Sequence, residues 1–314
     1  MTVLVSTWEE GVFAVTGETQ QQELAGQPVR CLAAGPDENT VAIVDGNRIC
    51  RRSGGGEWKT LVELDMGLAC LVTAGRDIYV GTDDAKVFRI AEGAPPEQLT
   101  GFDTTPGRDS WFAGSAVVDG RVVGPPLGVR SIAATADGQD LLANVHVGGI
   151  PRSSDGGRSW RPTIDINADV HEVAAHPAQP SSVIAAAATG FCISEDGGVT
   201  WAVVQAGLHA PYCSAAAFWG ESAIVAASTD HFAEFGVVYR WSQSSAEGRL
   251  EPVGAGIPSR TEGIVDTNCI ATTSSTLAVA DQGGNLYVSS DGRLSYRTRG
   301  LPSPSSVRIL PSAG

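Results

Sequence analysis

Three of the five histidines in this 314-residue chain could together hold a metal ion: His146, His171 and His209. Three neutral imidazoles leave coordination positions open for water or substrate, which suits Zn²⁺ or another divalent transition metal. Glu172 and Asp266 could then serve as a general base or orient a metal ligand. The histidines have no diagnostic local spacing, so they can equally be unrelated loop residues that share one crowded face.

A second set of residues could bind a substrate, and it comprises Arg30, Arg130, Arg308, Trp111, Asn268 and Cys213. A guanidinium group holds a carboxylate or phosphate through paired hydrogen bonds, so the three arginines favour an anionic ligand. Cys213 could also act as a nucleophile activated by a histidine, although a packed thiol is the more common outcome. The alternative for the whole set is that these polar residues only line a solvent-filled channel and bind no substrate.

These residues can meet only if the chain folds back on itself repeatedly, and its sequence has such a repeat. Short runs of β-branched residues and alanine end at Gly or Pro in seven places: 29–36, 68–75, 129–137, 170–177, 212–220, 267–275 and 306–311. Two further strands, and usually a weaker fourth, follow each of the first six runs. Units of about forty residues with four strands are typical of β-propeller blades.

The two ends of the chain predict how the ring closes. Residues 3–7 resemble a second strand with no first strand before it, and 306–311 a first strand with no second after it. Their pairing would remove the open edges of a linear array. We therefore predict an all-β fold, a seven-bladed β-propeller of four-stranded antiparallel blades, as one domain over 1–314. The insertions 103–127 and 242–266 interrupt the repeat, either as functional lids or as tolerated surface loops.

On such a ring the first strand of each blade lines the axis, and its opening residues face the mouth of the central channel. The second and third positions of these strands include Arg30, Arg130, Cys213, Asn268 and Arg308. His146, at the end of a second strand, His171, at the start of a first strand, and His209, just before one, would reach the same face. The segment 103–127, with Trp111, could cover this mouth.

The stretches SSDGGRSW (153–160) and SEDGGVTW (194–201) fall between third and fourth strands. In such a turn Asp accepts backbone hydrogen bonds, Gly permits positive φ and the aromatic residue packs on the blade. They resemble the Asp-box, S-x-D-G-x-x-x-W, of sialidases, sortilin-type receptor domains, some endoglucanases and photosystem assembly factors. The resemblance implies an Asp-box (BNR-repeat) propeller whose turns lie at the periphery, away from any catalytic centre. The Phe/Tyr-Arg-Ile-Pro motif of sialidases is missing, which argues against their chemistry.

The formal net charge of −14 argues against nucleic acid or an anionic membrane as a partner, since both require a basic surface. The N-terminus lacks an export signal, so we expect a cytoplasmic protein with reduced cysteines. Two functions remain. One is a metal-dependent hydrolase or lyase that acts on a small polar or anionic molecule at the mouth. The other is a noncatalytic propeller that presents a face to a protein partner, as the photosystem assembly factors do.

Overall fold

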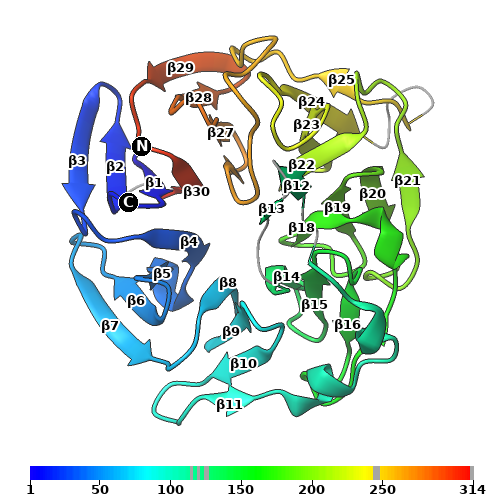
Figure 1. Ribbon diagram of the computed structural model, residues 1–314. Coiled ribbons are helices and arrows are strands. Elements are labelled where there is room, and N and C mark those ends of the chain that lie inside the picture. Colours follow the sequence, from blue (N-terminus) through cyan, green and yellow to red (C-terminus); the bar gives the residue numbers. More distant parts are fainter. Residues whose placement is uncertain (114–115, 119–120, 124–126, 243–247, 312–314) are drawn as a thin grey trace.

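The computed structural model describes residues 1–113, 116–118, 121–123, 127–242 and 248–311. Seven four-stranded antiparallel sheets stand as blades around a central axis, which confirms the predicted seven-bladed β-propeller (Figure 1). The inner strands of successive blades contact one another around the whole ring. None of the described helices is long and apolar enough to cross a membrane.

The blades are given from the innermost strand outward. Blade one comprises β30 (Pro304–Ile309), β1 (Val3–Thr7), β2 (Val12–Thr16) and β3 (Thr19–Glu23). Blade two comprises β4 (Val29–Ala34), β5 (Thr40–Val44), β6 (Arg48–Arg52) and β7 (Trp58–Glu63). Blade three comprises β8 (Leu68–Ala74), β9 (Asp77–Thr82), β10 (Val87–Ile90) and β11 (Glu97–Gln98). Blade four comprises β14 (Val129–Ala134), β15 (Leu141–Val145), β16 (Pro151–Ser153) and β17 (Arg161–Pro162).

The remaining blades follow the same order. Blade five comprises β18 (Val170–Ala175), β19 (Val183–Ala187), β20 (Gly190–Ser194) and β21 (Ala202–Val204). Blade six comprises β22 (Tyr212–Trp219), β23 (Ser222–Ser228), β24 (Val237–Ser242) and β25 (Glu251–Pro252). Blade seven comprises β26 (Ile270–Thr272), β27 (Thr276–Ala280), β28 (Leu286–Ser290) and β29 (Arg293–Thr298). The described residues also form the short 3₁₀ helices η1 (Pro36–Glu38), η2 (Thr100–Thr104), η3 (Arg108–Ser110) and η4 (Ile166–Ala168).

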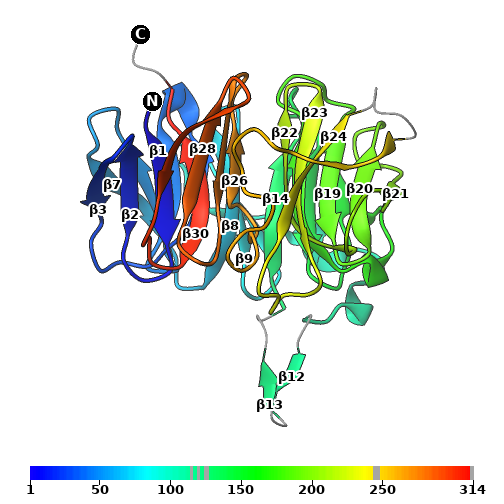
Figure 2. The same cartoon turned by 90° about the horizontal axis from the view of Figure 1, so that it is seen from above.

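The ring closes where both ends of the chain meet in blade one. β1 pairs antiparallel with β30 from Val3 opposite Ile309 to Thr7 opposite Pro304. β1 accordingly begins, and β30 ends, on the same face of the disc (Figure 2). This confirms the predicted closure, and it pairs β1 on both of its edges, with β2 and with β30.

Each second strand is enclosed by its own blade and the blades beside it. β5, β15, β19, β23 and β27 are buried along their whole length. This double burial explains why these strands read as continuous apolar runs such as TVAIV and VIAAA. The fourth strands β17 and β25 are exposed, which explains their weak sequence signal.

An extra residue interrupts the strand pairing near the start of six inner strands. The bulged residues are Arg30, Ala69, Arg130, His171, Ser214 and Ser305. A β-bulge turns a side chain out of the regular alternation of a strand and is common beside functional sites. Arg30, Ala69, Arg130 and Ser305 line one cavity at the mouth, whereas Ser214 is buried and donates to the carbonyl of Val265.

The insertion 103–127 lies between blades three and four. Within it, β12 (Ala116–Val118) and β13 (Arg121–Val123) pair as a separate two-stranded sheet. This hairpin stands off the face opposite the termini (Figure 2). That face is the mouth, because β14 begins there. The insertion 242–266 contains β25, the outer strand of blade six, and its residues 243–247 lie outside the described part of the chain.

The two Asp-Gly-Gly turns have nearly the same hydrogen bonds. Asp155 accepts bonds from the backbone N–H of Ser159 (2.9 Å) and from its hydroxyl (2.6 Å). Asp196 accepts the equivalent bonds from Thr200 (2.9 and 2.6 Å). Trp160 is buried and donates its indole N–H to the carbonyl of Gly157 at 3.0 Å. The turns fasten the outer strands of blades four and five, away from the axis.

We predict that Asp155→Ala lowers the free energy of unfolding by about 1 kcal/mol at neutral pH, because the turn loses its acceptor. The bonds from Ser159 lower the pKa of Asp155 to about 2 from its usual 3.8. The stability from this carboxylate is therefore complete above pH 4 and is lost as pH falls through 2. Urea denaturation of both proteins at several pH values checks this. A stability difference that stays constant down to pH 2 would contradict it.

Candidate metal centre

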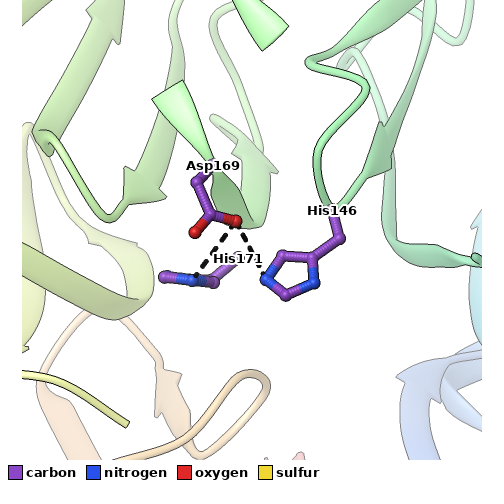
Figure 3. Close-up of side chains that lie close together, drawn as sticks. All are labelled: His146, Asp169 and His171. Carbon is purple, nitrogen blue, oxygen red and sulfur yellow. Dashed lines mark ion pairs between the residues drawn. The ribbon is translucent and has the colours of Figure 1, made fainter. Parts of the chain in front are cut away.

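Three possible metal ligands meet where blades four and five face each other at the mouth: His146, Asp169 and His171 (Figure 3). His146 follows the last residue of β15, Asp169 follows η4, and His171 is the bulged residue of β18. Oδ1 of Asp169 lies 2.9 Å from Nε2 of His146 and 3.9 Å from Nε2 of His171. The three ligand atoms all lie within 4.8 Å of one another.

Two contacts, with Cys213 and Tyr212, fix the orientation of the His171 ring. Its Nδ1–H donates to the carbonyl oxygen of Cys213 at 2.7 Å, and its face packs on Tyr212 with ring centroids 4.5 Å apart. This bond places the lone pair of the neutral ring on Nε2, which is buried and has no hydrogen-bond partner among the described residues. Burial, assisted by the charge of Arg130, lowers the pKa of His171 to about 4. The ring is therefore neutral at pH 7, as a metal ligand must be.

Asp169 takes its position from a left-handed backbone conformation. Its φ of 53° and ψ of 72° end η4, and the side chain of Asp165 closes the preceding turn by accepting from the N–H of Asn167. Left-handed geometry is tolerated better by Asp than by most residues, and it aims this carboxylate between the two imidazoles. Burial raises the pKa of Asp169, but the neighbouring His146, His171 and Arg130 outweigh it and hold the pKa below its usual value. Oδ1 of Asp169 is buried, and its 2.9 Å contact with Nε2 of His146 is an ion pair only when that histidine is protonated.

These residues fit a divalent transition metal. Two imidazole nitrogens and one carboxylate oxygen form a common ligand set for Zn²⁺ and for non-haem iron, with positions left open. Bonds of about 2 Å in a tetrahedral site would separate ligand atoms by roughly 3.3 Å, a value that lies between the 2.9 and 3.9 Å from Oδ1 of Asp169 to the two imidazole nitrogens. The backbone carbonyl on Nδ1 of His171 is also the outer contact that metal-bound histidines usually make.

Next to this group lies an axial cavity of about 410 Å³. Four predicted site residues line it, namely Arg30, Arg130, Asp266 and Asn268, together with Trp8, Asp83, His231 and Ser305 among others. Arg30 is neutralised by an ion pair with Asp83 at 2.8 Å. Asp266 accepts a hydrogen bond from the N–H of Thr267 at 2.8 Å. The polar ring expected from the repeat therefore exists, and Arg130 lies between it and the three ligands.

Glu172, a predicted catalytic residue, joins three blades. Its two carboxylate oxygens accept the N–H groups of Ala216 (2.9 Å) and Asn268 (3.1 Å). Ser131 and Ser306 occupy the equivalent place in other blades and accept N–H groups from the next inner strand in the same way. Burial raises the pKa of Glu172 to about 8. These contacts indicate that Glu172 links neighbouring blades and is not a base that a substrate can reach.

The structure does not bring His209 to the other two histidines. Its Nδ1 lies 2.8 Å from the hydroxyl of Tyr239, and its ring stacks on Phe235. Asp169 takes the third place instead. Asp169 stands only two residues before His171, so the sequence contains a sign that the two are neighbours. A search for histidines alone does not find a carboxylate ligand.

Three predicted substrate-binding residues also lie elsewhere. Arg308 donates to Thr40 and to the carbonyl of Asn39, at the end of the inner strands remote from the mouth. Trp111 is buried against Phe102, with ring centroids 5.5 Å apart. Cys213 is fully buried, and burial raises the pKa of its thiol far above the usual range, which excludes a ready thiolate nucleophile. Its contribution is the carbonyl that orients His171.

No family model matches the chain, and no curated protein matches it. Solved structures do resemble it. A computationally designed protein, Ika8, matches with a TM-score of 0.57 at 13% identity, over 97% of this chain and 86% of that one. The WD40 β-propeller domain of Doa1 matches with a TM-score of 0.61 at 12% identity, over 94% and 87%. At these identities the likeness establishes the propeller fold alone.

A glycoside hydrolase also shares the fold. The GH74 enzyme of Niastella koreensis matches with a TM-score of 0.61 at 12% identity, and the match covers 95% of this chain but 47% of that enzyme. Propellers thus serve both as scaffolds and as enzymes, and the function of this chain has to be argued from its own residues.

We predict that the contribution of Glu172 to the free energy of unfolding declines as pH rises from about 4.5 to about 8. In this window the folded protein retains a proton on Glu172 that the unfolded chain has lost. Glu172→Gln cannot titrate, so the stability difference between wild type and variant should change steadily with pH across the window. Urea denaturation from pH 4 to 9 measures it. Parallel stability curves for the two proteins would show that Glu172 is ionised in the fold.

Proposed function

We propose that the protein binds a divalent transition metal, such as Zn²⁺, at His146, Asp169 and His171. We further propose that it is a hydrolase or lyase for a small polar or anionic molecule held in the axial cavity. The observation that carries the proposal is the buried Nε2 of His171, which has no hydrogen-bond partner in the part of the chain that the structure describes, while Nδ1 is held by a carbonyl. A buried acceptor left unmatched costs free energy, and a metal would satisfy it.

A metal in this position supplies a Lewis acid that polarises a carbonyl group or lowers the pKa of a bound water. The residues of the chain would do the rest. The Cys213 carbonyl and the Tyr212 ring keep His171 in its orientation. Asp266 lies on the cavity wall, and we assign it the role of general base toward a bound molecule. Glu172 is already engaged by two backbone N–H groups.

A protein-binding scaffold is the second candidate, and exposed aromatic side chains around the mouth favour it. Trp8 is 43% exposed, Phe112 54% and Phe232 66%. Aromatic residues of this kind are enriched at protein interfaces. The Asp-box resemblance is compatible with this function, as is the likeness to a WD40 domain. The acidic chain makes a protein a better candidate partner than nucleic acid or an anionic membrane.

We predict that untagged protein binds one Zn²⁺ and that His171→Ala and Asp169→Asn each weaken binding at least about 100-fold. His209→Ala, which removes a histidine outside the group, should bind as the wild type does. Isothermal titration calorimetry with Zn²⁺ measures the affinities, and circular dichroism confirms that each variant is folded. Absence of Zn²⁺ binding in the wild type, or an equal loss in His209→Ala, would refute the site and favour the scaffold.

A further inference from the structure

Arg130 stands at the boundary between the axial cavity and the candidate metal ligands. It is the bulged residue of β14, so its side chain leaves the strand toward the mouth. It lines the cavity of about 410 Å³, whereas His146, Asp169 and His171 do not. Its Nη1 lies 3.4 Å from Nε2 of His146. A molecule in the cavity would therefore meet this guanidinium before it reached the metal.

The charge of Arg130 is not neutralised in the way that the charge of Arg30 is. Arg30 lines the same cavity but has Asp83 at 2.8 Å. In the described part of the chain, Arg130 has no carboxylate within ion-pair distance. Its charge reaches the ligands nonetheless, since it contributes to the lowered pKa values of Asp169 and His171. Arg130 is thus a partly buried cation beside a site that we assign to a second cation.

We propose that Arg130 binds an oxyanion, the carboxylate or phosphate group of a small ligand, and thereby couples anion binding to metal binding. The inference rests on the proposed metal site. A guanidinium and a divalent ion a few ångströms apart repel each other, and this repulsion weakens metal binding in the absence of an anion. An oxyanion between them is attracted to both and removes the penalty. The guanidinium suits this role because it presents paired N–H donors to two oxygens.

This arrangement requires that the metal and the anion bind cooperatively. By linkage, the factor by which the anion tightens metal binding equals the factor by which the metal tightens anion binding. It also defines the ligand class. The bound molecule carries an oxyanion at the end next to Arg130, and the half-exposed ring of Trp8 on the cavity wall offers apolar contact to the rest of it.

The test is Arg130→Gln, which removes the charge and retains a polar side chain. Calorimetric titrations of Zn²⁺ are run on wild type and variant without an added anion, with acetate and with inorganic phosphate. In the wild type we expect one of these anions to tighten Zn²⁺ binding about tenfold, and the preferred anion shows whether the ligand is a carboxylate or a phosphate. The variant should bind Zn²⁺ more tightly than the wild type without anion, and should lose the effect of the anion.

Arg76→Gln is the matched control, because it makes the same change in net charge at a side chain that is 80% exposed and distant from the mouth. It should behave as the wild type does. If Arg130→Gln leaves both the Zn²⁺ affinity and the anion effect unchanged, the inference is overturned. If the wild type binds no Zn²⁺, the proposed function fails separately. Direct titration of the two anions then decides: binding that Arg130→Gln abolishes supports the oxyanion subsite, and binding that it leaves intact, or no binding at all, refutes it.

Discussion

The antiparallel pairing of β1 with β30 is the interaction on which the rest of the structure depends. It joins the two ends of the chain in one blade and converts a row of sheets into a ring. Only in a ring do inner strands that are far apart in the sequence begin around one opening. Arg30, Arg130 and Asn268 come from three different blades and line the same cavity for this reason. Without the pairing, the blades would expose sheet edges and the mouth would have no fixed geometry.

Within the ring, hydrogen bonds between neighbouring inner strands hold the mouth rigid. Ser306 accepts the N–H of Leu32, Ser131 that of Val173, and Glu172 that of Ala216. Each acceptor residue directly follows a bulged residue, so its hydrogen bond to the next inner strand fixes the backbone beside the bulge. His171 is one of these bulged residues, and the hydrogen bond made by the next residue explains how the strand can hold a buried imidazole in one orientation. A ligand group fixed before binding loses little conformational entropy when a metal arrives.

The sequence was sufficient for the architecture because the repeat is carried by many residues at once. Buried second strands, turns and chain ends all indicate the same seven blades, so an error of one or two residues changes nothing. Single side chains lack this redundancy. The run SSVRIL can be aligned with the other first strands in more than one register, and one of these registers puts Arg308 at the mouth. The bulge at Ser305 shows that the true register differs from this one by two residues. Cys213 was displaced by one residue, since the bulged residue of blade six is Ser214.

The candidate metal group shows the same limit of sequence reasoning. His146 and His171 follow from strand direction alone, and the structure brings them together with ring centroids 5.5 Å apart. Asp169 does not follow from it, because its direction depends on a left-handed residue at the end of a short 3₁₀ helix. His209 lies in a loop, and its contacts with Tyr239 and Phe235 are set by packing within blade six. Loop side chains are determined by such tertiary contacts, which strand periodicity does not encode.

The polar composition of this site is itself evidence for a ligand. Blades four and five bring two imidazoles, a carboxylate and a guanidinium to one partly buried place, although apolar residues would pack there at lower cost. Within the described ranges the buried Nε2 of His171 has no hydrogen-bond partner, and leaving such a group unsatisfied costs about 1–3 kcal/mol. The hydroxyl-bearing ring of Tyr212 lies against the face of His171 rather than at this nitrogen. In a fold that bound nothing here, this unsatisfied nitrogen would only lower the free energy of unfolding. This arrangement supports our proposals of a cation shared by the imidazoles and Asp169 and of an anion held by Arg130.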